Sequence, residues 1–344
     1  FNSPGYVLSG ICAYEEGVSA GWLPLFSYGA VGWLRDGFRT AAFQVDPEPR
    51  QDLRRMSPEK VRRGIGDLQA RMPHNRLRVH LETCALDYGC PAAKNFFIGR
   101  YEAPLPTAPR CNARCLGCLS LQPAGGIPHS QNRIDFTPTP QEIAEVAVAH
   151  IERVKRQQPV VSFGQGCEGE PLMAAAVIAP AIERIRRQTG RGTINLNTNG
   201  SRPDLLAPVL AAGLDSMRVS INSLREPCYR AYVRPLGYGF AQVMQSIELA
   251  LSRDVFVSLN YLQIPGFTDT REESEALEDF LNRYPIQMIQ WRNLNFDPLR
   301  YWQRMSRAAV SSRPMGMDRL LDRLRRRFPL LRHGYFNPPR KRPH

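Results

Sequence analysis

Short hydrophobic runs alternate with amphipathic helical periods from Pro138 to about residue 300. Runs of this kind are typical of strands buried in a parallel sheet, and the helical periods between them indicate strand-helix units. The predicted strands are 160–163, 193–197, 216–221, 255–262 and 286–292, with one more inside 95–103. The predicted helices begin at Pro140 and then span 173–188, 204–212, 241–252 and 271–283. Six parallel strands predict an α/β fold built as a partial (β/α)6 barrel similar to a TIM barrel.

The first of these helices has a well-marked beginning. Thr139 is a predicted N-cap, Pro140 takes the first helical position, and Glu142 completes a capping box. Apolar residues such as Ile143 and Ile151 then share one face. The helix is therefore expected to pack against the strand at 160–163.

The rhythm of strands and helices is absent at both ends of the chain. We predict an accessory N-terminal region at 1–90, a barrel at 91–305 and a basic C-terminal extension at 306–344 that ends loosely around its prolines. Residues 17–34 carry no charge, but glycines, a proline and serines interrupt them. Turns between short strands are expected there, and no membrane span.

The net charge of +13 is unevenly distributed. Residues 307–344 contain ten arginines and one lysine against two aspartates, so most of the excess positive charge lies in this basic tail. Such a tail is often a solvated segment, and it can also attract RNA phosphates or an acidic peptide. The rest of the chain is nearly balanced, which weakens a general nucleic-acid interpretation.

Eight cysteines are present, three of them bunched in the segment CNARCLGC as Cys111, Cys115 and Cys118. This C-x3-C-x2-C spacing is too tight for easy mutual pairing and favours a metal in a reducing compartment, for which we expect the cytoplasm. Three thiolates in one loop can hold three irons of a [4Fe–4S] cubane, and with Cys167 as a fourth ligand they can also hold zinc. The spacing alone leaves both metals open.

Further motifs follow the cysteine loop, one after each predicted strand. GQGCEGEPL (164–172) follows the strand at 160–163, and NTNG (197–200) ends the next one. VSIN (219–222), AYVRP (231–235), YLQIPGFTD (261–269) and QWRNLNFDP (290–298) come later in the same order. Together with the cysteine triplet, these segments resemble the radical S-adenosylmethionine (SAM) superfamily over about residues 95–300.

The resemblance implies an enzyme with a [4Fe–4S] cluster held by Cys111, Cys115 and Cys118, and with SAM as its second cofactor. One electron, from a donor such as flavodoxin or ferredoxin, would cleave the bound SAM. The 5′-deoxyadenosyl radical would then remove a hydrogen atom from an unidentified substrate, which could be a small molecule, a peptide or RNA. The carried-over SAM-binding residues are Glu168, Gly169, Glu170, Asn197, Thr198, Ser220, Asn222, Arg234, Leu262 and Arg292.

Two positions depart from the family's usual motifs. Glu168 replaces the first glycine of the GGEP motif, which leaves a backbone role open. Gly117 stands where the family usually has an aromatic residue beside the adenine, so Leu116 or a residue from another strand must cover that base.

Three alternatives accompany this assignment. Cys84 and Cys90, together with Cys12 or Cys167, are candidate ligands of a second cluster, against the simpler interpretation of buried thiols. A second hypothesis is a radical SAM enzyme that modifies RNA through its basic tail. The competing class is a non-enzymatic zinc-binding interaction module built on the cysteine triplet and Cys167.

Overall fold

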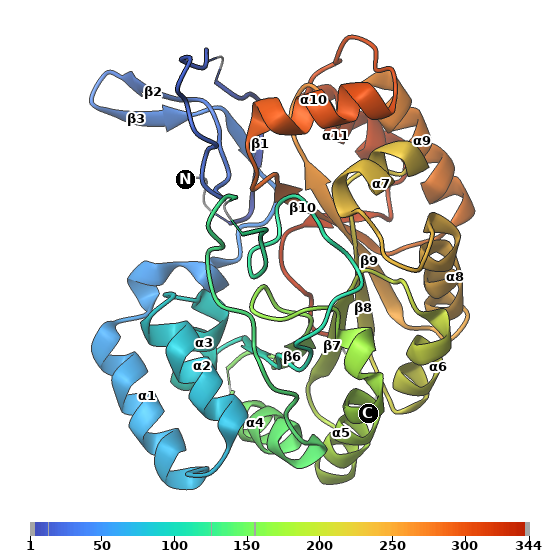
Figure 1. Ribbon diagram of the computed structural model, residues 1–344. Coiled ribbons are helices and arrows are strands. Elements are labelled where there is room, and N and C mark those ends of the chain that lie inside the picture. The colour runs from blue at the N-terminus through green and yellow to red at the C-terminus, as the bar shows by residue number, and fades with distance from the viewer. Residues whose placement is uncertain (1–3, 13, 125, 155, 341–344) are drawn as a thin grey trace.

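The computed structural model describes residues 4–12, 14–124, 126–154 and 156–340. Its central element is a seven-stranded parallel sheet in the order β11-β10-β9-β8-β7-β6-β5. The strands follow one another in chain order and the sheet curls, with helices on its outer side (Figure 1). The predicted α/β partial barrel is confirmed.

The sheet strands are β5 (Glu102–Pro104), β6 (Val160–Phe163), β7 (Thr193–Thr198), β8 (Ser216–Ile221), β9 (Phe256–Gln263), β10 (Met288–Asn293) and β11 (Arg332–Gly334). The helices of the barrel are α4 (Pro140–Arg153), α5 (Ala175–Gln188), α6 (Pro203–Ala211), α7 (Glu226–Val233), α8 (Phe240–Leu251) and α9 (Arg271–Arg283). Two more, α10 (Pro298–Ala308) and α11 (Met317–Arg327), follow the last predicted strand. Short 3-10 turns lie at Pro49–Gln51, Leu53–Arg55 and Pro171–Ala174.

Helix α4 forms as its sequence predicts. The Thr139 hydroxyl accepts a hydrogen bond from the backbone N–H of Glu142, whose carboxylate accepts one from the backbone N–H of Thr139 at 2.8 Å. Ile143 and Ile151 are fully buried in the core. The capping box thus fixes where the helix begins, and its apolar face fixes how it packs.

The structure differs from the sequence predictions at the two edges of the sheet. The range 95–103 is predicted to contain the first strand, but its first four residues belong to helix α3 (Pro91–Ile98), and the strand is only Glu102–Pro104. At the other edge, Arg332–Gly334 pairs in parallel with Met288–Gln290 and adds a seventh strand. This strand was missed because its three residues carry no hydrophobic period.

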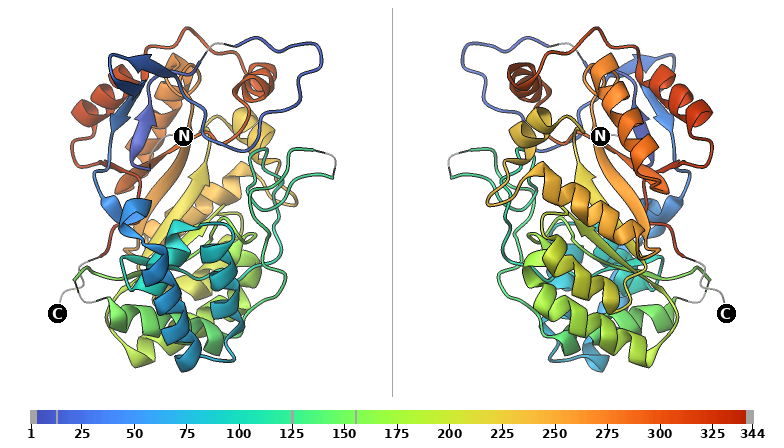
Figure 2. Two further views of the ribbon diagram at one scale, coloured as in Figure 1. Left: turned by 90° about the vertical axis from the view of Figure 1, so that its left-hand side faces the viewer. Right: turned by 90° about the vertical axis from the view of Figure 1, so that its right-hand side faces the viewer.

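The N-terminal residues form a hairpin, a small sheet and three helices. β2 (Val31–Leu34) pairs with β3 (Gly37–Thr40), and β1 (Tyr6–Leu8) pairs with β4 (Ala42–Gln44). Figure 2 shows the β2-β3 hairpin at the end of the barrel that carries α10, whereas α1 (Pro58–Arg71) and α2 (Arg76–Leu86) lie at the end with α4 and α5. None of the helices in the described part of the chain combines the length and apolar character that a membrane span requires.

The C-terminal segment packs against the barrel instead of ending loosely, as far as residue 340. Asn337 is buried and its amide donates to Glu102 of β5 at 2.7 Å. The Arg340 guanidinium donates to the backbone carbonyls of Asp215 and Asp254, which immediately precede β8 and β9. This segment therefore lies across the N-terminal ends of the strands. Pro343 lies outside the described residues, and the predicted boundaries at 90/91 and 305/306 stay predictions.

A buried carboxylate joins the loops that follow β5 and β6. Glu168 is 4% exposed, and one of its oxygens accepts from the backbone N–H groups of Thr107 and Ala108 at 2.8 and 3.0 Å. Its other oxygen accepts from the N–H groups of Gly164 and Gln165, both at 2.7 Å. The carboxylate is the acceptor that satisfies these four backbone donors.

We expect Glu168→Gln to lower the free energy of unfolding by roughly 2–5 kcal/mol, because an amide NH2 group would face two of the four donors and leave them unsatisfied at about 1–3 kcal/mol each. The measurement is urea unfolding followed by circular dichroism under anaerobic conditions. The exposed Glu183→Gln variant is the matched control and is expected to unfold like the wild type. Equal midpoints for the two variants would contradict the bridging role.

Candidate functional site

The three clustered cysteines lie in an irregular loop after β5, close to the end of α7. The loop is attached to that helix end by backbone hydrogen bonds from Arg114 to Val233 at 3.1 Å and from Leu116 to Tyr232 at 3.1 Å. All three cysteines are half-buried. The loop has no secondary structure of its own, so these contacts with α7 set its position.

The thiols lie in surroundings that disfavour free thiolates. Burial, followed by the negative charge of Glu170, raises the pKa of Cys111 to about 11. Burial also raises the pKa of Cys115, and the charges of Cys111 and Cys118 raise it further. The Arg133 guanidinium lies beside the group and donates to the Cys118 sulfur at 3.5 Å and to the Ser120 hydroxyl at 3.2 Å. Bound metal cations would supply the positive charge that three thiolates need.

The donor set fits a [4Fe–4S] cluster better than a closed zinc site. Among the described residues, the ligand atoms of His80, Cys84 and Cys167 all lie within 4.8 Å of one another. The sulfurs of Cys111, Cys115 and Cys118 do not form such a group, so they are spread more widely. Cys167, the predicted fourth zinc ligand, lies instead beside His80 and Cys84, which disfavours the four-cysteine zinc module. Three spread thiolates match three irons of a cubane and leave the fourth iron without a protein ligand.

The loop after β6 lies directly against the cysteine loop. The backbone N–H of Gly169 donates to the Ala108 carbonyl at 2.6 Å, and that of Glu170 donates to Arg110 at 2.9 Å. A Cβ atom at Gly169 would lie 2.0 Å from the Arg110 carbonyl oxygen, so only glycine permits this approach. The predicted residues Gly169 and Glu170 thus lie beside Cys111, whereas the Glu168 side chain is occupied by the four backbone donors.

Glu170 joins this loop to the end of β7. Its carboxylate accepts from the Thr198 hydroxyl and from the backbone N–H of Asn199, the latter at 2.7 Å. Burial raises the pKa of Glu170 to about 7, against the effect of these hydrogen bonds. The structure therefore brings the predicted residues Glu170 and Thr198 into direct contact.

The turn after β7 also contacts the cysteine loop. Asn199 donates to the Asn112 side chain at 2.9 Å, and Asn112 donates to the Ser201 hydroxyl at 2.8 Å. The neighbouring Asn197 is buried and donates to the Gly164 carbonyl at 2.9 Å. Asn197 thus holds the loop after β6 with its amide group, a positioning contact that its sequence motif did not indicate.

The two predicted residues at the end of β8, Ser220 on the strand and Asn222 just after it, have different partners. The Ser220 hydroxyl accepts from the Asn260 side chain at 3.2 Å, inside the curl of the sheet. Asn222 is 1% exposed and donates to the Cys228 carbonyl and the Tyr301 hydroxyl, at 3.3 and 3.4 Å. Its carbonyl oxygen is buried without a hydrogen-bond partner. That oxygen is an acceptor available to a bound group.

An arginine and an aromatic ring flank the cysteine loop from α7. The Arg234 Nε donates to the Arg114 carbonyl, and the charge of Cys115 acts against the burial that lowers the pKa of Arg234. A Cβ at Gly117 would lie 2.8 Å from the Tyr232 hydroxyl oxygen. The space that an aromatic residue at position 117 would need is therefore occupied by Tyr232.

The inside of the curled sheet is polar and carries two arginines. Arg292 of β10 donates to the Asn260 side chain at 2.9 Å, lies opposite Leu262 of β9 in the strand register, and stacks over the Tyr335 ring at 3.7 Å. Arg218 of β8 donates to Gln290, and its Nε has no hydrogen-bond partner. Sequence reasoning missed Arg218, although Ser216, Arg218 and Ser220 alternate with apolar residues as one face of a strand does.

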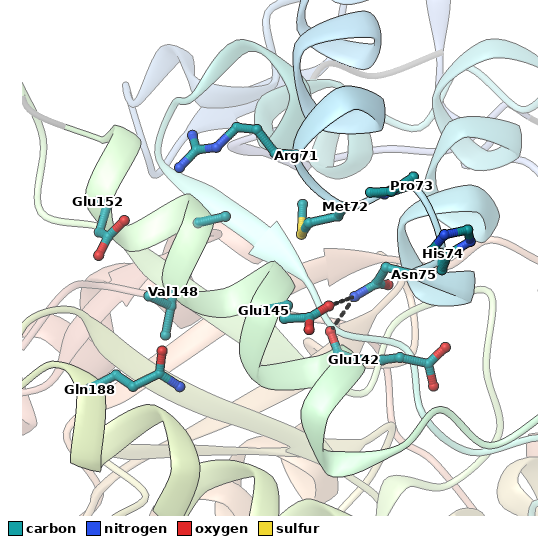
Figure 3. Close-up of a pocket in the computed structure, with 11 residues that line it drawn as sticks. Arg71, Met72, Pro73, His74, Asn75, Glu142, Glu145, Val148, Glu152 and Gln188 are labelled. Carbon is teal, nitrogen blue, oxygen red and sulfur yellow. Dashed lines mark hydrogen bonds between the residues drawn. The ribbon is translucent and has the colours of Figure 1, made fainter.

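A pocket outside the barrel, drawn in Figure 3, is unrelated to these groups. It lies between the α1-α2 turn and α4, and its lining includes His74, Glu145 and Gln188. The Asn75 amide donates to the Glu142 carbonyl and to the Glu145 carboxylate, both at 2.9 Å. These polar groups are already paired, so the pocket offers little chemistry.

Comparisons with known proteins place residues 105–280 in one family: they match the sequence model of the radical SAM superfamily. The GTP 3′,8-cyclase of Heliobacterium modesticaldum is 32% identical over 164 residues, which is 46% of this chain and 45% of that enzyme. The GTP 3′,8-cyclase of Lactiplantibacillus plantarum is 29% identical over 203 residues, or 57% of this chain and 55% of that enzyme. The chain thus spans about half the length of these relatives.

Among solved structures, that of methylornithine synthase covers 85% of this chain and 75% of its own, with a TM-score of 0.47 and 14% identity. The family match covers half of the chain and includes the cysteine loop and the strands β6 to β9. The chain therefore belongs to the radical SAM superfamily, whose enzymes use a [4Fe–4S] cluster and S-adenosylmethionine.

Proposed function

We propose that this radical SAM enzyme acts on an anionic, phosphate-bearing substrate inside the curl of its sheet, and that a nucleoside triphosphate such as GTP is the first candidate. The observation that carries the proposal is the pair Arg218 and Arg292. Neither guanidinium has an ion-pair partner among the residues that the structure describes. Both lie on inner strand positions, where a substrate would bind.

The charges around the two arginines favour an anion. Burial, followed by the positive charge of Arg292, lowers the pKa of Arg218 to about 9. The nearby carboxylate of Glu102 already forms an ion pair with Arg50 at 3.7 Å and accepts a hydrogen bond from the Asn337 amide. Two like charges enclosed in this way are unfavourable until a negative group pairs with them. A phosphate group accepts several hydrogen bonds from guanidinium groups and suits that role.

We propose that the residues of the site divide into three groups. Cys111, Cys115 and Cys118 would hold the cluster, which when bound supplies the electron that cleaves SAM. Glu170, Thr198, Ser220, Asn222 and Arg234 would bind SAM, with Tyr232 replacing the aromatic residue absent at Gly117. Gly169 and Asn197 would position the loop, and Leu262 would lie at the adenine. A small one-electron donor protein and a cytoplasmic location stay predictions.

The GTP assignment draws on the relatives, which are GTP 3′,8-cyclases and match half of this chain. The alternative of RNA as substrate has less support from the basic tail. Arg323 and Arg327 of that tail both pair with Glu278 of α9, so part of its charge is neutralised within the chain. The two guanidinium groups lie inside the curl of the sheet, so they suit a small anion such as GTP better than an RNA chain bound on the outside.

The cluster assignment is tested by metal content. After anaerobic reconstitution the wild-type chain is expected to hold about four irons and four sulfides at the triplet. Alanine at Cys111, Cys115 or Cys118 should abolish the SAM-dependent change in the electron paramagnetic resonance spectrum of the reduced protein. Cys12→Ser, at an exposed cysteine, is the control and should leave that change intact. A triplet variant that retained it would contradict the assignment.

The substrate assignment is tested with GTP and two arginine variants. Arg218→Gln and Arg292→Gln should each raise the KM for GTP about tenfold or more, the effect of losing one charge-assisted hydrogen bond. The KM for SAM should change little in Arg218→Gln. Production of 5′-deoxyadenosine at varied GTP and SAM concentrations measures both constants, and Arg319→Gln on the exposed face of α11 is the control.

Two results would overturn the substrate proposal. One is that no nucleoside triphosphate binds the wild-type chain or promotes 5′-deoxyadenosine formation. The other is that Arg218→Gln weakens SAM alone, which would assign the inner arginines to the cofactor. Salt-dependent RNA retention that is lost on deleting residues 307–344 would favour the RNA alternative.

A further inference from the structure

A second group of metal-binding side chains lies outside the cysteine loop. His80 and Cys84 belong to α2, and Cys167 comes from the loop after β6. Their ligand atoms all lie within 4.8 Å of one another, with the His80 Nε2 3.5 Å from the Cys84 sulfur. Cys84 and Cys167 are buried, at 1% and 5% exposed. The radical SAM chemistry proposed above uses none of these three side chains.

Local structure explains why these groups meet. His80 and Cys84 are four residues apart on one helix, so they share a face. The backbone of Cys90 is close to the same group: its N–H donates to the Cys84 carbonyl at 2.8 Å, and Cys90 is the N-cap of α3. The charge of Cys84 contributes to the raised pKa of Cys90, and that of Cys90 to the raised pKa of Cys167. Three ligand side chains therefore converge, and the backbone contact with Cys84 makes Cys90 the candidate fourth ligand.

The spacing of the ligand atoms distinguishes one ion from a cluster. Around a tetrahedral zinc, with bonds of about 2.0–2.3 Å, ligand atoms lie roughly 3.3–3.8 Å apart, so the observed group needs only a small contraction. Cysteines that bind different irons of a cubane must be farther apart than these ligand atoms are. One imidazole and three thiolates is a common ligand set of structural zinc sites.

We propose that His80, Cys84 and Cys167 form a second metal site that binds one zinc ion, and that a side-chain movement of Cys90 completes its tetrahedral coordination. The ion would join the N-terminal helices α2 and α3 to the loop that carries Glu168 and Glu170. It closes a chain segment of some eighty residues, which stabilises the folded state by restricting the unfolded one. The site does not depend on the proposed substrate.

The experiment is metal analysis of the anaerobically purified full-length chain. The wild type should contain one zinc per chain in addition to its iron. A triple variant with alanine at Cys111, Cys115 and Cys118 should lose the iron and keep the zinc. Adding Cys84→Ser and Cys167→Ser to that background should remove the zinc, whereas adding Cys228→Ser, at a buried cysteine elsewhere, should not.

Cobalt substitution provides a spectroscopic test of the same site. The triple variant produced with cobalt in place of zinc should show sulfur-to-cobalt charge-transfer bands and the intense visible bands of tetrahedral thiolate coordination. His80→Ala should shift or weaken those bands, and circular dichroism should show whether the chain is folded.

Three results would overturn the proposal. The anaerobic wild type could contain a Cys84–Cys167 disulfide and no metal. The Cys84→Ser and Cys167→Ser changes could leave the zinc content unchanged. The triple variant could retain iron and sulfide in place of zinc, which would assign a cluster to these residues. None of these three results depends on whether the triplet holds iron. Failure of the zinc site can therefore be distinguished from failure of the proposed function.

Discussion

The close approach of two irregular loops is the constraint on which the site depends. The loop with the three cysteines contains no helix or strand, and the loop after β6 forms backbone hydrogen bonds with it in addition to those from α7. That approach is permitted by the missing side chain of Gly169 and held by the Glu168 carboxylate, which satisfies four N–H groups from both loops. A bulkier residue at position 169, or a neutral one at position 168, would move the cysteines relative to Glu170 and the strand ends.

The part of the fold that follows periodic patterns was predictable. The capping box at Thr139 and the buried runs such as Val160–Phe163 express local rules, and the structure follows them. The edges of the sheet were not predictable. The edge strands Glu102–Pro104 and Arg332–Gly334 have three residues each, and they owe their strand conformation to pairing with a neighbouring strand. A pairing partner distant in sequence leaves no local signal.

The same distinction applies to the site. The order of motifs along the chain placed Glu170, Thr198 and Ser220 at consecutive strand ends, because parallel strands all end at one edge. Sequence did not indicate that the Glu168 side chain serves the backbone, since two of its donors lie about sixty residues away. Nor did it indicate that Tyr232 fills the space beside Gly117, a contact that depends on how α7 packs.

Residues 167–170 connect the features of the barrel that matter for chemistry. Cys167 faces the ligands from α2, Glu168 ties the two loops, Gly169 permits contact with the cysteine loop, and Glu170 reaches Thr198 on β7. Four consecutive residues thus contact four different neighbours within one short loop. Such a segment has few conformations that satisfy all of its contacts, so its geometry depends on every neighbour at once. The N-terminal helices are therefore part of what holds the site, because they supply the partners of Cys167.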